Sequence, residues 1–416
     1  MPRHLCIPVA FLLACLFLLS TAQAADERSA IRIGATASMT GSYAVPGTNQ
    51  MQGLRMWAAD VNARGALLGY PVEVVVYDDA SDPETSAALY ERLITEDQVD
   101  FLVGPYGSDI TMAAAAVADR HGMPMVAAGA AARKIWMQGF DNVFQIDTPA
   151  GQYMDLPLKL AGELGLSRVA LVYADSEFPR EVADGVRASI RALEMELVFD
   201  EAYPEDKTEF SGLAERIIAT QPEVLLGGTY LEDSIGLVRA AKKAGLSPKI
   251  FAMTVGPAFR EFGDALGEDT EGIMGTVAWM RSGNLPMAYD FSYRYKQKFG
   301  ANASAQSAYG YAAGQVLEAH ETRRAAQQAT YGYGAGQVLE AAVRLADSLD
   351  QGAVREQLQS MKFRSLLGHY RVDGAGIQVA KTTYVLQWQG GYRLLVLPED
   401  LRDSPVRFPF VPWGER

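Results

Sequence analysis

Residues 72–83 have the sequence VEVVVYDDASDP, and this stretch points most directly to the fold class. Its first part, Val72 to Tyr77, is a β-branched run that is typical of a buried parallel strand. Asp82 then suits the N-cap of a helix, with Pro83 at the first helical position, where its fixed φ is favourable. A strand followed at once by a capped helix predicts an α/β protein.

The same alternation continues on both sides of this stretch. Further strands are expected at 31–33, 101–104, 123–128, 168–173, 223–227, 249–254 and 382–388, and helices at 50–63, 177–193, 210–218 and 231–244. Alternation at this spacing predicts parallel sheets with right-handed crossovers. The strands form two batches, about 31–147 and 168–278, and each is the size of one doubly wound lobe.

Composition excludes several classes of protein. The chain has 416 residues, of which 49% are hydrophobic and 21% charged, so it is not disordered, collagen-like or a coiled coil. Fifty acidic residues against 37 basic ones give a formal net charge of −13. Proteins that bind nucleic acid or anionic membranes need a basic face, and this acidity argues against both.

The first 25 residues, MPRHLCIPVAFLLACLFLLSTAQAA, have the pattern of a secretory signal peptide. Arg3 supplies the basic start, an apolar run follows, and Ala22-Gln23-Ala24 matches a cleavage site. We expect residues 1–24 to be removed on export to the periplasm. Lipidation at Cys15 is the alternative. Cleavage after Ala24 removes both Cys6 and Cys15, so no disulfide or thiol chemistry is expected.

One segment of the chain is repeated. Residues 309–319, YGYAAGQVLEA, recur at 331–341 as YGYGAGQVLEA. A solenoid needs about three or more repeats, so we interpret the pair as a local duplication of one helix. The intervening residues 320–330 could continue the helix or form a loop.

No catalytic constellation is found in the sequence. His121, His320 and His369 lie far apart and form no H-E-x-x-H pattern, and residues 104–108, GPYGS, are not a G-x-S-x-G elbow. Asp78, Asp79 and Asp82 could suggest a cation site, but their spacing is not that of an EF-hand loop, and structural roles are favoured. We therefore expect no catalytic residue, metal or cofactor, and interpret the chain as a binding protein.

An ordered set of short motifs carries a resemblance to a known family. The set comprises Ile31–Gly34, Asp60–Gly65, Tyr77–Pro83, Val103–Pro105, Pro124–Val126 and Gly227–Tyr230. On these residues the chain resembles the leucine/isoleucine/valine-binding proteins, the periplasmic solute-binding components of ABC transporters. The resemblance spans roughly residues 30–390.

The resemblance implies two Rossmann-like, doubly wound lobes joined by a hinge of three segments, with ligand trapped when the lobes close. Lobe 1 would comprise residues 25–147 and 279–380. Lobe 2 would comprise residues 148–278 and 381–416, so that the late strand at 382–388 rejoins it.

The strand ends indicate where ligand would bind. Ligands of parallel sheets lie beyond the carboxyl ends of strands, against helix N-termini. Ser108 follows one strand and can either cap the helix expected from about Asp109 or offer its hydroxyl, and the resemblance implies that it holds a ligand carboxylate. Gly129 and Ala130 form a second such turn, followed by Ala131 where the family often has serine or threonine.

Two further features bear on the ligand. Tyr43, Tyr106, Phe178 and Tyr230 are candidates for an aromatic wall. Amino-acid-binding members of the family have an acid after the strand that matches Ile250–Met253, and here Thr254 stands there. A buried ammonium without a carboxylate partner is disfavoured. An acid-free aromatic cleft would suit an aromatic or aliphatic carboxylate.

These observations predict a monomeric substrate-binding protein that serves the permease subunits of an ABC importer. The ligand would be a small amino acid or a related organic carboxylate. A ligand-sensing subunit for a membrane receptor is the alternative function.

Overall fold

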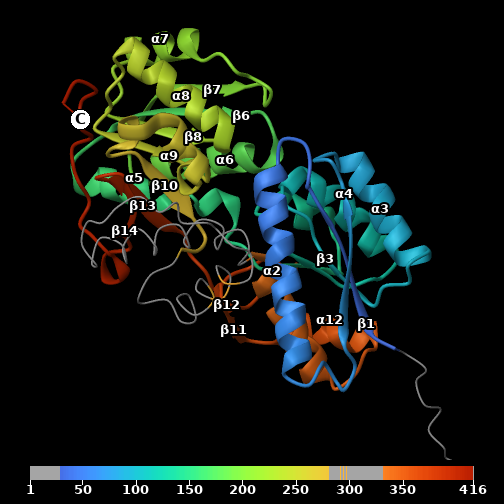
Figure 1. Ribbon diagram of the computed structural model, residues 1–416. Coiled ribbons are helices and arrows are strands. Elements are labelled where there is room, and N and C mark those ends of the chain that lie inside the picture. The colour runs from blue at the N-terminus through green and yellow to red at the C-terminus, as the bar shows by residue number, and fades with distance from the viewer. Residues whose placement is uncertain (1–28, 281–290, 292–293, 295–296, 298–330, 416) are drawn as a thin grey trace, which may run out of the picture.

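The computed structural model describes residues 29–280, 291, 294, 297 and 331–415. Within these residues the chain forms two α/β lobes, each built around its own sheet (Figure 1). The prediction of two doubly wound lobes is confirmed. The expected signal peptide and the first copy of the repeat lie outside the described residues.

Lobe 1 is built on a five-stranded parallel sheet with the strand order β2-β1-β3-β4-β5. Its strands are β1 Ile31–Ala37, β2 Val72–Asp78, β3 Phe101–Val103, β4 Met125–Ala127 and β5 Val143–Gln145. Its helices are α2 Ala44–Ala63, α3 Pro83–Thr95, α4 Ser108–Arg120, the helical residues 331–346 and α12 Gln351–Ser360, beside the small hairpin of β11 Phe363–Ser365 and β12 Gly368–Tyr370.

Lobe 2 is built on a seven-stranded sheet with the order β14-β13-β10-β9-β8-β6-β7. Its parallel strands are β6 Arg168–Ala174, β7 Glu196–Tyr203, β8 Val224–Gly228, β9 Ile250–Met253 and β10 Met274–Val277. The late hairpin of β13 Tyr384–Gln389 and β14 Tyr392–Leu397 joins antiparallel to β10. The helices are α5 Asp155–Glu163, α6 Glu177–Ala192, α7 Ser211–Ala219, α8 Leu231–Ala244 and α9 Arg260–Leu266.

The chain passes between the lobes where β5 leads to α5, where β10 ends, and where β12 leads to β13. Three crossings of this kind form a hinge, because each lobe keeps its own core. The domain boundaries inferred from the sequence remain a prediction.

Helix ends follow the local signals in the sequence. The Asp82 carboxylate accepts from the N–H of Thr85 at 2.7 Å, and Pro83 opens α3, as predicted. The helix expected at 50–63 begins earlier, at Ala44. Pro46 lies in its first turn, where a missing N–H costs nothing, so the helix tolerates this proline.

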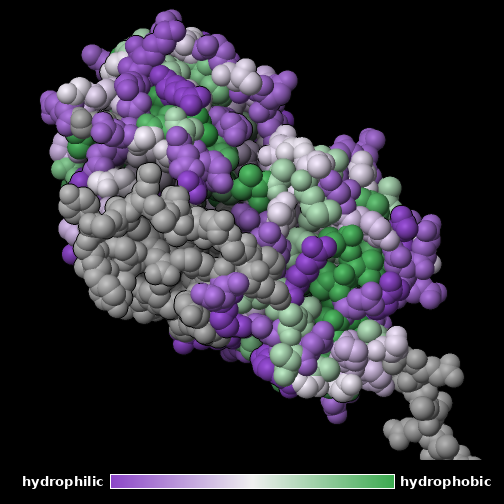
Figure 2. Space-filling model, viewed as in Figure 1, coloured by the Kyte–Doolittle hydropathy of each residue, from purple (hydrophilic) through white to green (hydrophobic). Residues whose placement is uncertain are grey.

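Hydrophilic side chains cover most of the described surface in the space-filling view, with an apolar area on the lobe that holds α2 and α3 (Figure 2). Edge strand β2 contributes half-buried valines to that lobe. Among the described residues, no helix has both the length and the apolar character needed to cross a membrane.

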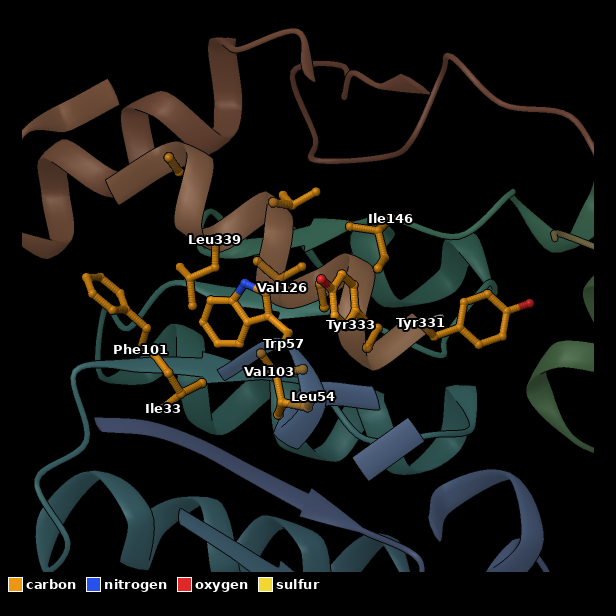
Figure 3. Close-up of a cluster of buried hydrophobic side chains, with 14 of the residues drawn as sticks. Ile33, Leu54, Trp57, Phe101, Val103, Val126, Ile146, Tyr331, Tyr333 and Leu339 are labelled. Atoms are coloured by element: carbon orange, nitrogen blue, oxygen red, sulfur yellow. The ribbon is translucent and has the colours of Figure 1, made fainter. Parts of the chain in front are cut away.

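The second copy of the repeat packs closely on α2. Tyr333 donates its hydroxyl to Asp60 at 2.7 Å, and Glu340 accepts from the indole N–H of Trp57 at 3.1 Å. A Cβ added at Gly336 would overlap the Trp57 ring, so only glycine allows this approach. Figure 3 shows Trp57 beside Leu339 in the buried core of lobe 1.

The first copy, residues 309–319, has the same residue types at all of these contact positions. Within the eleven residues the two copies differ only at Ala312, which corresponds to Gly334. A Cβ at Gly334 would lie 2.7 Å from Cδ1 of Leu367. Downstream of the second copy, Ala342 and Val343 are fully buried. Of the two copies, the second therefore has the sequence that packs better against α2.

Deleting residues 309–330 is expected to preserve the fold, because every contact with α2 described above is made by the second copy. Deleting residues 320–341 instead produces a chain that differs from the first deletion variant at one position only. It has alanine where the first variant has Gly334. That extra methyl meets Leu367 and should lower the free energy of unfolding by about 1 kcal/mol relative to the first deletion. Urea unfolding of both chains measures the difference. Loss of folding in the first deletion would show that residues 309–330 are required.

Candidate functional site

A cavity lies where the two lobes meet, and it encloses about 380 Å³, part of it open to solvent. Much of the wall comes from segments that follow parallel strands at their carboxyl ends, as expected for sheets of this kind. The lining residues are Tyr106, Gly107, Ser108, Gly129, Ala131, Asp147, Tyr153, Phe178, Tyr230, Val255 and Tyr331.

The structure brings together five of the eight residues singled out by sequence: Tyr106, Ser108, Gly129, Phe178 and Tyr230 line the cavity. Tyr43 packs against two of these rings at the cavity edge. Ala130 and Thr254 are not among the lining residues. The Thr254 hydroxyl instead donates to the carbonyl of Thr229 and accepts from its N–H at 2.7 Å, which ties β8 to β9.

Ser108 is placed as a hydrogen-bond donor toward the cavity. Gly107, at φ 94°, is the N-cap of α4, so the interpretation of Ser108 as that cap is wrong. The Ser108 oxygen accepts from the N–H groups of Ala131 at 3.2 Å and Ala132 at 3.1 Å. A hydroxyl has two acceptor positions and one proton. Among the described residues no acceptor takes that proton, which leaves it for a ligand.

Aromatic rings form a continuous chain across the two lobes. The ring centroids of Tyr43 and Tyr106 are 5.7 Å apart, and those of Tyr43 and Tyr230 are 5.2 Å apart. Phe178 continues the chain at 5.9 Å from Tyr230 and 5.1 Å from Tyr153. These spacings are those of favourable aromatic pairs, so the rings present a largely apolar wall and hold the lobes together.

Polar contacts also join the lobes at the cavity rim. The Tyr43 hydroxyl donates to Glu205. Lys134 forms an ion pair with Glu177 at 2.6 Å, and the N–H of Glu177 donates to Asp109 at 3.4 Å. Each contact pairs a residue of lobe 1 with one of lobe 2. The structure is therefore that of a closed form.

One acid on the cavity wall was missed from the sequence. Asp147 is 4% exposed and follows β5, whose three residues were too short to recognise as a strand. Its carboxylate accepts from the N–H of Thr148 at 2.7 Å and from the Tyr153 hydroxyl at 3.2 Å. Burial raises the pKa of Asp147 to about 6, against the opposing charge of Lys381. The expectation of an acid-free cleft is therefore wrong.

Tyr331 is another lining residue that sequence analysis missed, as it did Tyr153 and Val255. It is the first residue of the second repeat copy, far along the chain from the strands that surround it. In Figure 3 its side chain points away from Trp57. The rule that ligands bind beyond the carboxyl ends of strands could not identify Tyr331, because this residue belongs to a helix that packs on α2.

Other polar residues noted in the sequence have structural partners. The Asp79 carboxylate accepts from the hydroxyls of Thr36 and Ser38, both at 2.7 Å. His121 lies 2.8 Å from a carboxylate oxygen of Glu91 on the surface. Within the described residues, no three His, Cys, Asp or Glu side chains gather as metal ligands would.

Comparisons with known proteins identify similar chains. Residues 30–321 match the family model described as periplasmic binding protein. The Leu/Ile/Val-binding protein homolog 7 of Brucella melitensis is 25% identical over 407 residues, which cover 93% of this chain and 96% of that protein.

Two solved structures share the fold. One is the branched-chain amino acid transporter substrate binding protein of Streptococcus pneumoniae in complex with isoleucine, with TM-score 0.75, 21% identity, and coverage of 91% of this chain and 100% of that one. The other is a solute binding protein of an ABC transporter from R. palustris in complex with benzoate, with TM-score 0.73, 20% identity, and coverage of 91% and 97%.

Proposed function

This chain belongs to the periplasmic binding protein family, and we propose that it is the substrate-binding protein of an ABC importer. Its ligand would be a small amino acid or a related organic carboxylate, held between the two lobes. Its site of action would be the periplasm, and its partners the permease subunits of the transporter.

The observation that carries this proposal is the donor site at the start of α4. Ser108 lines the cavity at the first position of α4, where the helix dipole favours negative charge. A carboxylate fits such a site. The aromatic wall on the remaining sides suits the apolar part of a small organic molecule.

Binding would act by shifting an equilibrium between open and closed lobes. A ligand can favour closure only by contacting both lobes, since equal affinity for the two forms shifts nothing. Ser108 from lobe 1 and the rings of Phe178 and Tyr230 from lobe 2 line one cavity and meet this requirement. The permease would then distinguish the closed form from the open one.

Thermal unfolding of the purified chain against a panel of compounds tests the proposal. The panel holds free amino acids, aliphatic carboxylates, benzoate and 4-hydroxybenzoate. A true ligand at about 100 times its dissociation constant should stabilise the chain by about 2.7 kcal/mol. Glucose and putrescine, which lack a carboxylate, serve as controls. Stabilisation by neither amino acids nor carboxylates would overturn the proposal.

A further inference from the structure

One contact between the lobes uses a carboxylate that lies outside the ligand cavity. Glu181 belongs to α6 of lobe 2 and is not among the residues that line the cavity. Its Oε2 accepts from the backbone N–H of Arg133. Arg133 is the first residue of the short 3₁₀ helix η1, Arg133–Gln138, which follows β4 in lobe 1. A carboxylate of one lobe therefore caps a helix of the other, and the contact breaks when the lobes separate.

The closed form leaves half of this carboxylate without a hydrogen bond. Oε1 of Glu181 is a buried atom and has no hydrogen-bond partner among the described residues. An ionised carboxylate has about four acceptor positions, and removing them from water without partners is costly. Separation of η1 from α6 would expose the group to water again. Closure is therefore more costly when Glu181 is ionised than when it carries a proton.

The surroundings of Glu181 offset this cost only in part. The charge of Arg133 and the backbone N–H groups of Arg133, Lys134 and Gly151 favour the ionised form. Burial outweighs them and raises the pKa of Glu181 to about 7. The ammonium of Lys134 is already paired, at 2.6 Å, with Glu177, which lies one turn before Glu181 in α6.

A groove on the hinge side of the molecule connects Glu181 to solvent. It is open, it is separate from the ligand cavity, and residues of both lobes line it. Its charged side chains are those of Arg133, Asp155, Glu181, Asp184, Asp373 and Lys381. Three of them have partners of their own: Asp155 accepts from Ser189, Asp184 pairs with Arg187, and Lys381 donates to the carbonyl of Ile146. The groove gives a proton access to Glu181 without passing through the cavity.

We propose that Glu181 couples closure of the lobes to the uptake of a proton, so that the closed form is favoured as the pH falls. In the open form Glu181 is exposed and ionised, and on closure it takes a proton from solvent through the groove. A group whose pKa is higher in the closed form than in the open form stabilises the closed form at low pH, and this effect is lost as the pH rises through the higher pKa. The closed form therefore gains progressively below about pH 7. This inference rests on the proposed function and assigns a regulation to it.

The pH dependence of closure in the wild type and in E181Q tests the proposal. Small-angle X-ray scattering of the ligand-free chain reports closure as a smaller radius of gyration. In the wild type the ratio of closed to open chains should rise by about tenfold from pH 8 to pH 6, as for a group that takes up one proton below pH 7. E181Q has a neutral side chain of the same shape. It should be more closed than the wild type at pH 8 and should lack this tenfold change.

Calorimetric titration with L-leucine and with 4-hydroxybenzoate gives a second measurement, because a compound held by the closed form binds better when closure is easier. From pH 8 to pH 6, its dissociation constant should fall about tenfold further in the wild type than in E181Q. Asp147 and Asp109 are present in both chains, so the difference between the chains reports Glu181. E177Q is the matched control. It removes the ion pair with Lys134 across the same contact and should weaken closure equally at every pH.

The outcomes separate this inference from the proposed function. The same pH dependence in E181Q and the wild type would overturn the inference, and so would a wild-type chain that opens as the pH falls. Loss of the pH dependence in E177Q as well would assign it to the contact as a whole and overturn the role of Glu181. If no compound of the panel binds, the proposed function fails, and the scattering comparison still decides whether closure takes up a proton.

Discussion

Replacing Gly336 by valine is expected to lower the free energy of unfolding by about 3 kcal/mol, through overpacking of the core of lobe 1. A Cβ at this position overlaps Cδ2 of Trp57 and lies 2.5 Å from Cγ and Cε3 of the same ring. Trp57 is fully buried, and its indole N–H is held by Glu340. The ring cannot move away without breaking that hydrogen bond, so the helix must shift.

In urea unfolding, the effect would appear as a lower midpoint concentration. The slope of the free energy of unfolding against urea concentration would not change. Gly162 in α5 provides a matched control, because it is an exposed helical glycine whose added Cβ would meet only the methyl of Met195 at 3.4 Å. G162V should change the free energy of unfolding by less than about 0.5 kcal/mol. Equal stability of G336V and G162V would show that the second repeat copy does not pack on α2 as described.

The sequence predicts elements well where two independent signals coincide. The helix at 231–244 was placed correctly, because its periodicity, its terminal lysines and Gly245 in the left-handed conformation all mark the same boundaries. Strand β7 was missed because it lies at the sheet edge and most of its residues are half-exposed or exposed. Its side chains therefore lack the apolar run that reveals a buried strand.

The candidate site was predictable only where it follows recognisable strands. Tyr106, Ser108 and Gly129 were found because β3 and β4 are apolar runs that end in loops. Asp147 follows the three-residue β5, and Tyr331 arrives from a helix that docks on α2. The positions of these two residues in the cavity depend on tertiary packing, which a local sequence pattern does not reveal.

Replacing Ser108 by alanine is expected to weaken carboxylate binding by about 100-fold, within the range of a hydrogen bond to a charged group. The variant removes the proton that faces the cavity. It also leaves the N–H groups of Ala131 and Ala132 without their acceptor, which should lower the free energy of unfolding by about 1–2 kcal/mol.

Calorimetric titration with L-leucine and 4-methylpentanoate distinguishes these two consequences of S108A. Because both ligands share the carboxylate, S108A should weaken them by the same factor. S86A is the matched control: Ser86 is a fully buried serine that hydrogen-bonds Thr36 at 3.1 Å outside the cavity lining. It should lower stability without lowering affinity. A loss confined to L-leucine in S108A would place the ammonium, and not the carboxylate, at the start of α4.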